Sequence, residues 1–164
     1  MTAAFTGDVL LTGATGFVGM ELLARYLERG DRGVVTPVRA DSPEAAQARI
    51  DNVLENLFGA DAPAYRPRVH AVAADLTAPD LGLTGDERIR LAERVTKIVH
   101  SAASVSFTLE LEEARAINLE GTRRMLELAE LARERGGLEC PLAGVREVRI
   151  VGMISGGSAA LCRL

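Results

Sequence analysis

Residues 9–19 decide the fold, because an apolar run is followed at once by three glycines at a fixed spacing: Val9-Leu10-Leu11-Thr12-Gly13-Ala14-Thr15-Gly16-Phe17-Val18-Gly19. The run predicts a buried strand, and the stretch after it predicts a helix. Between them, Gly13 would make a tight turn, Gly16 would let the backbone approach phosphates, and Gly19 would let the helix pack against the strand. The free N–H groups of the helix would face the anion.

The stretch therefore predicts a site for the pyrophosphate of a dinucleotide, and the alternative is a glycine-rich turn without a ligand. The cofactor-binding residues expected here are Gly13, Thr15, Gly16, Phe17, Val18 and Gly19. The helix is expected over 17–28, with one apolar face against the strands. That face would comprise Phe17, Met20, Leu23, Ala24 and Leu27.

Strands and helices alternate along the rest of the chain. Further strands are expected over 34–38, 69–73, 97–100 and 148–154, and further helices over 43–58, 86–94 and 111–135. Pro37 fits a strand only if its missing N–H lies at the strand's end, while Ser42 and Pro43 form a helix start and Gly136-Gly137 a helix stop. The alternation predicts an α/β fold, a doubly wound, Rossmann-like parallel sheet of about five strands, in one domain over residues 1–164.

Composition narrows the function classes. The chain has 164 residues, 48% of them hydrophobic and 26% charged, which suits one ordinary globular core. A net charge of −4 gives no indication of the basic surface that nucleic acids or anionic membranes bind. Without an apolar run of about 18 residues or a signal peptide, we expect no membrane span and a cytoplasmic location. Cys140 and Cys162 lack metal-site spacing, and the only histidines are His70 and His100, so no metal is expected.

Five stretches, in order, resemble the extended short-chain dehydrogenase/reductases, and most closely the thioester reductase and fatty acyl-CoA reductase domains of the male-sterility type. They are residues 12–19, 38–40, 74–76, 100–107 and 117–122. The resemblance covers about residues 8–135, whereas residues 136–164 look unlike the family and carry the expected fifth strand. It implies NADPH-dependent reduction of carrier-bound or CoA-bound acyl thioesters to an aldehyde or an alcohol.

Arg39 follows the second expected strand, where an acidic residue would bind the ribose 2′-hydroxyl and an arginine instead suits a 2′-phosphate. This favours NADP(H) as the cofactor. The alternative is a solvated arginine at a strand end. Arg49 is a weaker second candidate, because its helix could simply display it to water.

Two further groups of residues follow the third and fourth strands. Asp75 could accept from the adenine amino group while the backbone of Leu76 flanks the ring, and a turn-forming Asp is the alternative. Ser101, Ala102 and Ala103 would lie at the carboxyl edge of the sheet, where ligands of such sheets bind. Their small side chains would admit the cofactor's ribose and nicotinamide, although a packing demand would look the same.

Asn118 shares a helix face with Ala114, Gly121 and Met125, all suited to packing against the sheet. We expect its amide to be buried and to find partners there. In the resembled family this Asn supports the active-site geometry through the helix backbone. A merely satisfied helix asparagine is the alternative.

The catalytic half of the family pattern is missing. Reductases of this type use a Ser after the fifth strand and then a Tyr followed at i+4 by Lys. The Tyr protonates the developing alkoxide, and the Lys lowers the pKa of the Tyr. Here Tyr26, Tyr65 and Lys97, the only residues of their types, do not form that spacing. Ser155 is the counterpart of the Ser, unless it belongs to an unrelated tail. We therefore expect a truncated protein that lacks the substrate-binding domain.

The main hypothesis is the NADPH-binding part of a thioester reductase, not catalytic alone. The alternatives are a non-catalytic nucleotide-binding module and a relative of NAD(P)-dependent sugar epimerases or dehydratases. The long segment 42–68 and the sequence of residues 104–107 favour the reductase. Expected partners are an acyl thioester on a carrier protein or CoA, and either a second copy or a chain that supplies the missing half, since the fifth strand would present an open edge.

Overall fold

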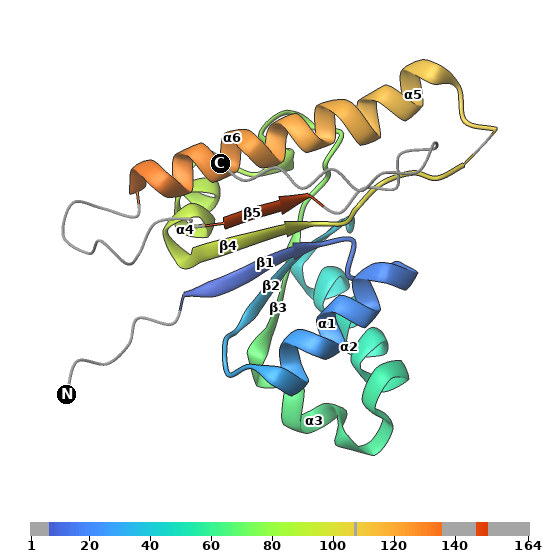
Figure 1. Cartoon of the computed structure of the whole chain (residues 1–164), viewed down its shortest axis with the longest axis vertical. Coiled ribbons are helices and arrows are strands. Elements are labelled where there is room, and N and C mark those ends of the chain that lie inside the picture. The colour runs from blue at the N-terminus through green and yellow to red at the C-terminus, as the bar shows by residue number, and fades with distance from the viewer. Residues whose placement is uncertain (1–6, 107, 136–146, 151–164) are drawn as a thin grey trace.

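In the computed structural model, which describes residues 7–106, 108–135 and 147–150, five parallel strands form one sheet in the order β3-β2-β1-β4-β5 (Figure 1). The strands are β1 (Asp8–Thr12), β2 (Val34–Val38), β3 (Val69–Ala73), β4 (Val95–His100) and β5 (Glu147–Ile150). β1 lies at the centre, with β2 on one side and β4 on the other. The predicted doubly wound α/β fold is confirmed.

Helices cover both faces of the sheet (Figure 1). One face carries α1 (Phe17–Arg29), α2 (Pro43–Phe58) and the short α3 (Ala62–Tyr65), which η1 (Gly59–Asp61) and η2 (Arg66–Arg68) flank. The other face carries α4 (Gly85–Arg94), α5 (Leu111–Arg115) and α6 (Gly121–Arg135), with η3 (Pro79–Gly82) beside them. All five strands point the same way, so their carboxyl ends meet at one edge, beside the start of α1 and the start of α5.

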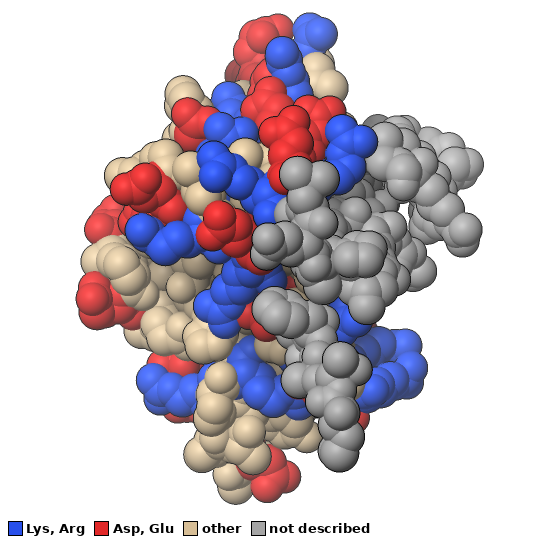
Figure 2. All heavy atoms as spheres, turned by 90° about the vertical axis from the view of Figure 1, so that its left-hand side faces the viewer, with Lys and Arg blue, Asp and Glu red and all other residues tan. Residues whose placement is uncertain are grey.

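The opposite edge is the one that faces the viewer in Figure 2. Over this face Lys and Arg side chains lie between Asp and Glu side chains, so the net charge of −4 is not gathered into one field there. Among the helices of the described ranges, none combines the length and the apolar character that a membrane crossing requires.

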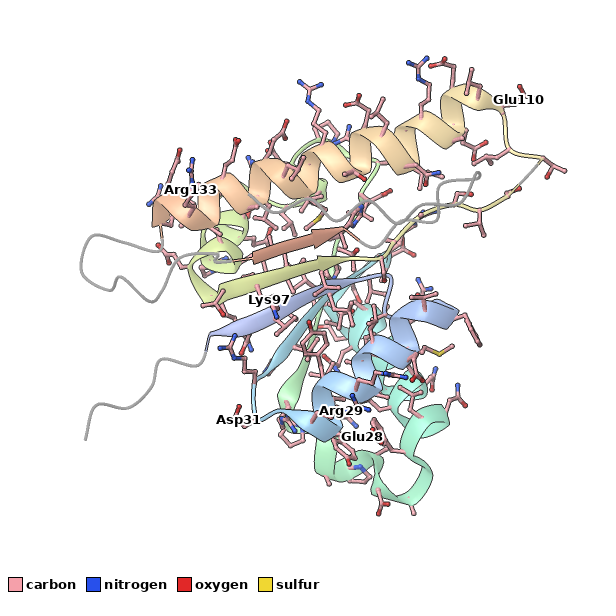
Figure 3. The ribbon with its side chains drawn as sticks, in the orientation of Figure 1. Glu28, Arg29, Asp31, Lys97, Glu110 and Arg133 are labelled. Atoms are coloured by element: carbon pink, nitrogen blue, oxygen red, sulfur yellow. The ribbon has the colours of Figure 1, made fainter. Side chains whose placement is uncertain are left out.

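The helix predicted over 111–135 is one run with an irregular centre. A π-helical turn, η4 (Ala116–Glu120), joins α5 to α6. Glu110, which precedes α5, and Arg133, near the end of α6, mark the two ends of this run in Figure 3. Such a turn inserts an extra residue into a helix and is frequent at functional sites.

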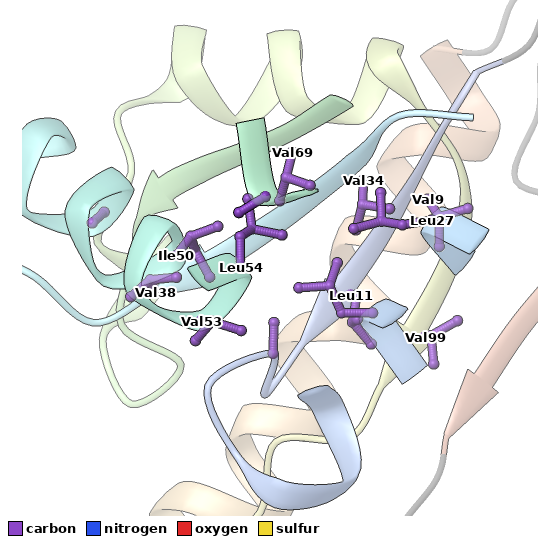
Figure 4. Close-up of a cluster of buried hydrophobic side chains, with 14 residues drawn as sticks. Val9, Leu11, Leu27, Val34, Val38, Ile50, Val53, Leu54, Val69 and Val99 are labelled. Carbon is purple, nitrogen blue, oxygen red and sulfur yellow. The ribbon is translucent and has the colours of Figure 1, made fainter. Parts of the chain in front are cut away.

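The sheet divides the core into two layers, because neighbouring residues of a strand point to opposite faces. Leu11 packs in the layer under α1 and α2 (Figure 4), and Leu10 in the layer under α4 and α6. Both side chains are fully buried. The apolar run that opens the motif therefore reads as a strand covered on both faces.

Most predicted boundaries are confirmed. Strands 34–38 and 69–73 are as predicted, and Ser42 Oγ accepts from the Ala45 N–H at 3.1 Å to begin α2. Pro37 is tolerated because the pairing of β2 with β1 covers only Val34 and Val35. β4 begins two residues before its predicted start. The predicted helix stop at 136–137 and strand residues 151–154 lie outside the described residues.

The predicted apolar face of α1 is wrong at one end. Leu23 and Leu27 are buried as expected, but Phe17 is 88% exposed. Phe17 is the first residue of α1, which begins at the carboxyl edge of the sheet. Helical spacing gives the direction of a side chain but not the point at which the helix leaves the core.

Candidate functional site

The turn between β1 and α1 needs glycine at Gly13 for two reasons. Its φ is +75°, in the region that side chains disfavour. A Cβ there would also lie 2.8 Å from the amide nitrogen of Ala102 and 2.9 Å from Ser101 Oγ. The tight turn is thus confirmed, and it is packed against the residues that follow β4.

The other two glycines have different surroundings. At Gly19, the carbonyl group of Gly13 occupies the space of a Cβ, so at this position α1 meets the turn directly. At Gly16, whose N–H donates to the Gly13 carbonyl at 2.8 Å, the one described atom that a Cβ would meet within 4 Å is that same oxygen, at 3.3 Å. Space therefore remains above Gly16, whereas none remains at Gly19.

Among the described residues, no side chain caps the start of α1. Its N-cap, Gly16, has no side chain to bind the N–H groups of the first turn, and these groups have no acceptor within the helix. Thr15, Phe17 and Val18 are all exposed around it. Uncapped N–H groups and the positive end of the helix dipole together suit a phosphate.

Two cations stand beside the neighbouring strand. Arg39 is the first residue after β2 and is exposed, and within the described ranges its guanidinium donates no hydrogen bond. Arg49, on α2, donates from Nη1 to the Arg39 carbonyl at 2.5 Å. Arg49 was the weaker candidate from the sequence, and the structure places it against Arg39.

Asp75 makes the turn that was its alternative interpretation. Its Oδ1 accepts from the Thr77 N–H at 2.8 Å and from the Thr77 hydroxyl at 2.7 Å. The backbone hydrogen bond from Thr77 is the main cause that lowers the pKa of Asp75, and the charges of Arg39 and Arg124 act in the same direction against partial burial. The carboxylate is therefore ionised at neutral pH.

Leu76 lies under α6. Its carbonyl accepts from Arg124 Nη1 at 3.0 Å, and a Cβ on Gly121 would be 3.5 Å from Leu76 Cβ. A methyl group at Gly121 would thus make an ordinary van der Waals contact with the segment after β3.

The ends of β1 and β4 are joined through Thr12, which is fully buried. Its hydroxyl accepts from the amides of Ser101 at 3.1 Å and Ala102 at 3.2 Å, and Ser101 Oγ donates to the Thr12 carbonyl at 2.7 Å. A packing demand for small residues is therefore present at Ser101 and Ala102, because they abut the glycine turn. Ala103, next along, is exposed.

The expected burial of Asn118 is wrong. The residue is exposed, and yet both ends of its amide are satisfied: Oδ1 accepts from the Ser104 N–H at 2.7 Å, and Nδ2 donates to the Ser104 carbonyl at 2.9 Å. Asn118 lies in the π-helical turn, whose extra residue breaks the 3.6-residue spacing from which a shared face was inferred. Gly121 and Met125, beyond this turn, are buried as predicted.

His100 is a site residue that the sequence reasoning missed. It is 2% exposed, and its ring lies between Thr12 Oγ1, 2.7 Å from Nδ1, and Thr122 Oγ1, 3.2 Å from Nε2. Burial lowers the pKa of His100 to about 4. The available signal was an imidazole at the end of an otherwise apolar strand, directly before three small residues.

The remaining candidates are not brought together at this edge. Ser155 lies outside the described residues. Lys97 lies on the α1 side of the sheet (Figure 3), with Nζ 5.9 Å from the centre of the Tyr26 ring. The ring of Tyr65 stacks on that of Phe58, with 4.0 Å between the ring centres, close to the amino end of β3.

Comparison with known proteins bears on this edge of the sheet. Residues 11–138 match the NAD-binding family described as Male sterility protein. The chain is 48% identical over 128 residues to an isonitrile lipopeptide synthase of Streptomyces coeruleorubidus, covering 77% of this chain and 9% of that protein. It is 34% identical over 126 residues to the fatty acyl-CoA reductase wat of Drosophila melanogaster, covering 74% of this chain and 24% of that protein.

Solved structures agree. The terminal R domain from the myxalamid PKS-NRPS biosynthetic pathway has a TM-score of 0.77 and 32% identity, covering 94% of this chain and 36% of that one. The reductase (R) domain of a non-ribosomal peptide synthetase from Mycobacterium tuberculosis has a TM-score of 0.67 and 32% identity, covering 88% and 32%. The chain thus spans about a third or less of these relatives, and within that span it belongs to the Male sterility protein family of NAD(P)-binding domains.

Proposed function

We propose that this chain binds NADP(H) as the cofactor-binding part of an acyl-thioester reductase. The observation that carries the proposal is the β1–α1 turn. Gly13 and Gly19 have no room for a side chain, whereas the space above Gly16 and the uncapped start of α1 are open. A turn that served packing alone would have no need of a free helix start beside an open glycine.

The preference for the phosphorylated cofactor rests on Arg39. Its exposed guanidinium follows β2, the strand whose end meets the adenosine ribose in such folds. Arg49 stands beside it and adds a second positive charge. Two guanidinium groups suit a phosphate, which binds arginine through paired, charge-assisted hydrogen bonds.

The remaining predicted residues would line the rest of the cofactor. Asp75 keeps Oδ2 for an adenine amino group while Oδ1 forms its turn, and Leu76 would flank the ring. Ser101, Ala102 and Ala103 would face the ribose and nicotinamide from the end of β4, and Asn118 would fix the Ser104 backbone beside them. When bound, the nicotinamide would supply the hydride.

The substrate class follows from the relatives named above, a fatty acyl-CoA reductase and reductase domains of peptide synthetases. For the protein to which these residues belong we propose an acyl thioester on CoA or on a carrier protein. The 164 residues themselves contain no Tyr-x-x-x-Lys, so the proposal for them is binding, without turnover. The role of Ser155 stays a prediction.

Calorimetric titration of the chain with NADPH and, separately, with NADH tests the proposal. We expect both to bind and NADPH to bind about tenfold to a hundredfold more tightly, as one charge-assisted contact to the 2′-phosphate would give. Equal affinities would overturn the assignment of Arg39. Failure of both to bind would overturn the function.

A further inference from the structure

Hydrogen bonds run in one continuous path from the glycine turn to the π-helical turn. Thr12 Oγ1 lies 2.7 Å from His100 Nδ1, and His100 Nε2 lies 3.2 Å from Thr122 Oγ1. Thr122 Oγ1 in turn donates to the Asn118 carbonyl at 2.6 Å. The path passes through a side chain that has almost no contact with water, since His100 is 2% exposed.

Counting hydrogens gives the path a direction. A threonine hydroxyl has one hydrogen, and that of Thr122 is spent on the Asn118 carbonyl, so toward His100 it can only accept. Nε2 must therefore carry the imidazole hydrogen. The Thr12 hydroxyl already accepts from the Ser101 and Ala102 amides, which leaves its own hydrogen for an unprotonated Nδ1.

The path also closes around one loop. Thr12 holds the start of the segment 101–104 through two amides, and Asn118 holds its end through both backbone groups of Ser104. His100 is the side chain that connects these two anchors. A side chain that only filled the core would need apolar contacts and no particular hydrogen bonds. In His100, both ring nitrogens have a hydrogen-bond partner.

We propose that His100, as its neutral Nε2–H tautomer, is a positioning residue that fixes the glycine turn and Asn118 relative to each other across the segment 101–104. The inference rests on the proposed function only in treating these two ends as parts of one cofactor site. His100 itself touches neither end: it acts through Thr12, which directly precedes Gly13, and through Thr122.

The first test needs no cofactor. Long-range ¹⁵N–¹H NMR of the chain at pH 7 reports which nitrogen of each histidine ring carries hydrogen, and His100→Gln assigns the signals. We expect His100 to show the Nε2–H tautomer alone. An Nδ1–H tautomer, or a charged ring, would overturn the proposal, whatever the chain binds.

The second test removes one link with Thr122→Val, which keeps the shape of the side chain. We expect the amide signals of Gly13, Ser101 and Ala102 to shift and the affinity for NADPH to fall about three- to tenfold, the effect of one lost neutral hydrogen bond. The control is Thr96→Val, which removes a hydroxyl near the start of β4, where it lies 3.5 Å from the Asp8 carbonyl.

Amide shifts confined to the neighbours of Thr122, together with an unchanged affinity, would show that the path transmits nothing and would overturn the inference. If the unaltered chain binds no NADPH, the proposed function fails instead. In that case the tautomer and the amide shifts still decide whether His100 has the positioning role.

Discussion

The carbonyl group of Gly13 fills the space that a Cβ on Gly19 would need. The turn and the first turn of α1 are therefore in backbone contact. We expect Gly19→Ala to lower the free energy of unfolding by about 1–3 kcal/mol, since the backbone must move to admit the methyl group. Urea denaturation measures the loss. Gly16→Ala is the control and should lose less, at most about 1 kcal/mol, because its φ of −94° accepts a side chain and its methyl group would meet the Gly13 carbonyl oxygen at 3.3 Å, a tight contact that a small shift relieves. Equal losses in the two variants would contradict the difference in space.

Gly16→Val should abolish NADPH binding and leave the far-ultraviolet circular dichroism unchanged. The larger side chain would project into the space left open above the start of α1, which the pyrophosphate would need. Calorimetry and circular dichroism on the same sample separate the two effects. Binding that survived the change would place the phosphate site elsewhere.

Arg39→Ala should reduce the preference for NADPH over NADH by about tenfold to a hundredfold, through loss of NADPH affinity alone. The matched control is Arg90→Ala, which removes an exposed arginine from α4 on the other face of the sheet. Both affinities should be unchanged in that variant. A preference that persisted in Arg39→Ala would transfer the role to Arg49, which the double variant would reveal.

The free energy of unfolding should decrease as the pH is lowered, because of His100. Its pKa in the folded chain is about 4 and its ordinary value is 6.5, so between these values the unfolded chain binds more protons. The contribution is complete above about pH 6.5 and is lost as the pH falls toward 4, with an upper limit of roughly 3 kcal/mol. Unfolding curves of the wild type and of His100→Gln from pH 7 to pH 4.5 check this contribution. The carboxylates titrate in both proteins, so the difference between the two pH dependences reports His100. Parallel pH dependences would rule out this contribution.

The 164 residues alone should not oxidise NADPH in the presence of an acyl-CoA. General acid catalysis typically contributes about 10²–10⁴-fold, and the Tyr and Lys that supply it in the resembled family are absent from the sequence. Absorbance at the NADPH band follows the reaction, with the Ser155→Ala variant in parallel. Turnover that this variant abolished would refute the expectation and establish Ser155 as catalytic.

Sequence reasoning works here wherever a local rule decides the outcome. The strands at 34–38 and 69–73 are short apolar runs between turn residues, and Ser42 with Pro43 begins α2 as helix-capping rules require. The glycine turn is equally local, since its three glycines act within seven residues. These features can be predicted without the rest of the chain, whereas the contacts of Gly13 with Ser101 and Ala102 cannot.

The failures concern residues whose surroundings come from far along the chain. Phe17 fits an apolar helix face, but the open edge of the sheet leaves it in water. Asn118 fits a buried face, but a π-helical turn shifts the spacing and brings its amide to Ser104. His100 gives no local signal of its role, because Thr12 and Thr122 reach it only when β1, β4 and α6 have met.

The central place of β1 imposes an order on folding. Leu10 pairs with Val35 on one side, close in sequence, and with Ile98 on the other, and such distant pairing is slow to form. During synthesis, the backbone groups along one edge of β1 would stay unpaired until β4 emerged from the ribosome. Exposed strand edges of this kind promote aggregation. We therefore expect chaperones to bind nascent chains that are stalled before β4 has left the ribosome. Chaperones should release chains that are long enough for both β4 and α6 to have emerged. Crosslinking of stalled ribosomes would show where along the chain this exposure ends.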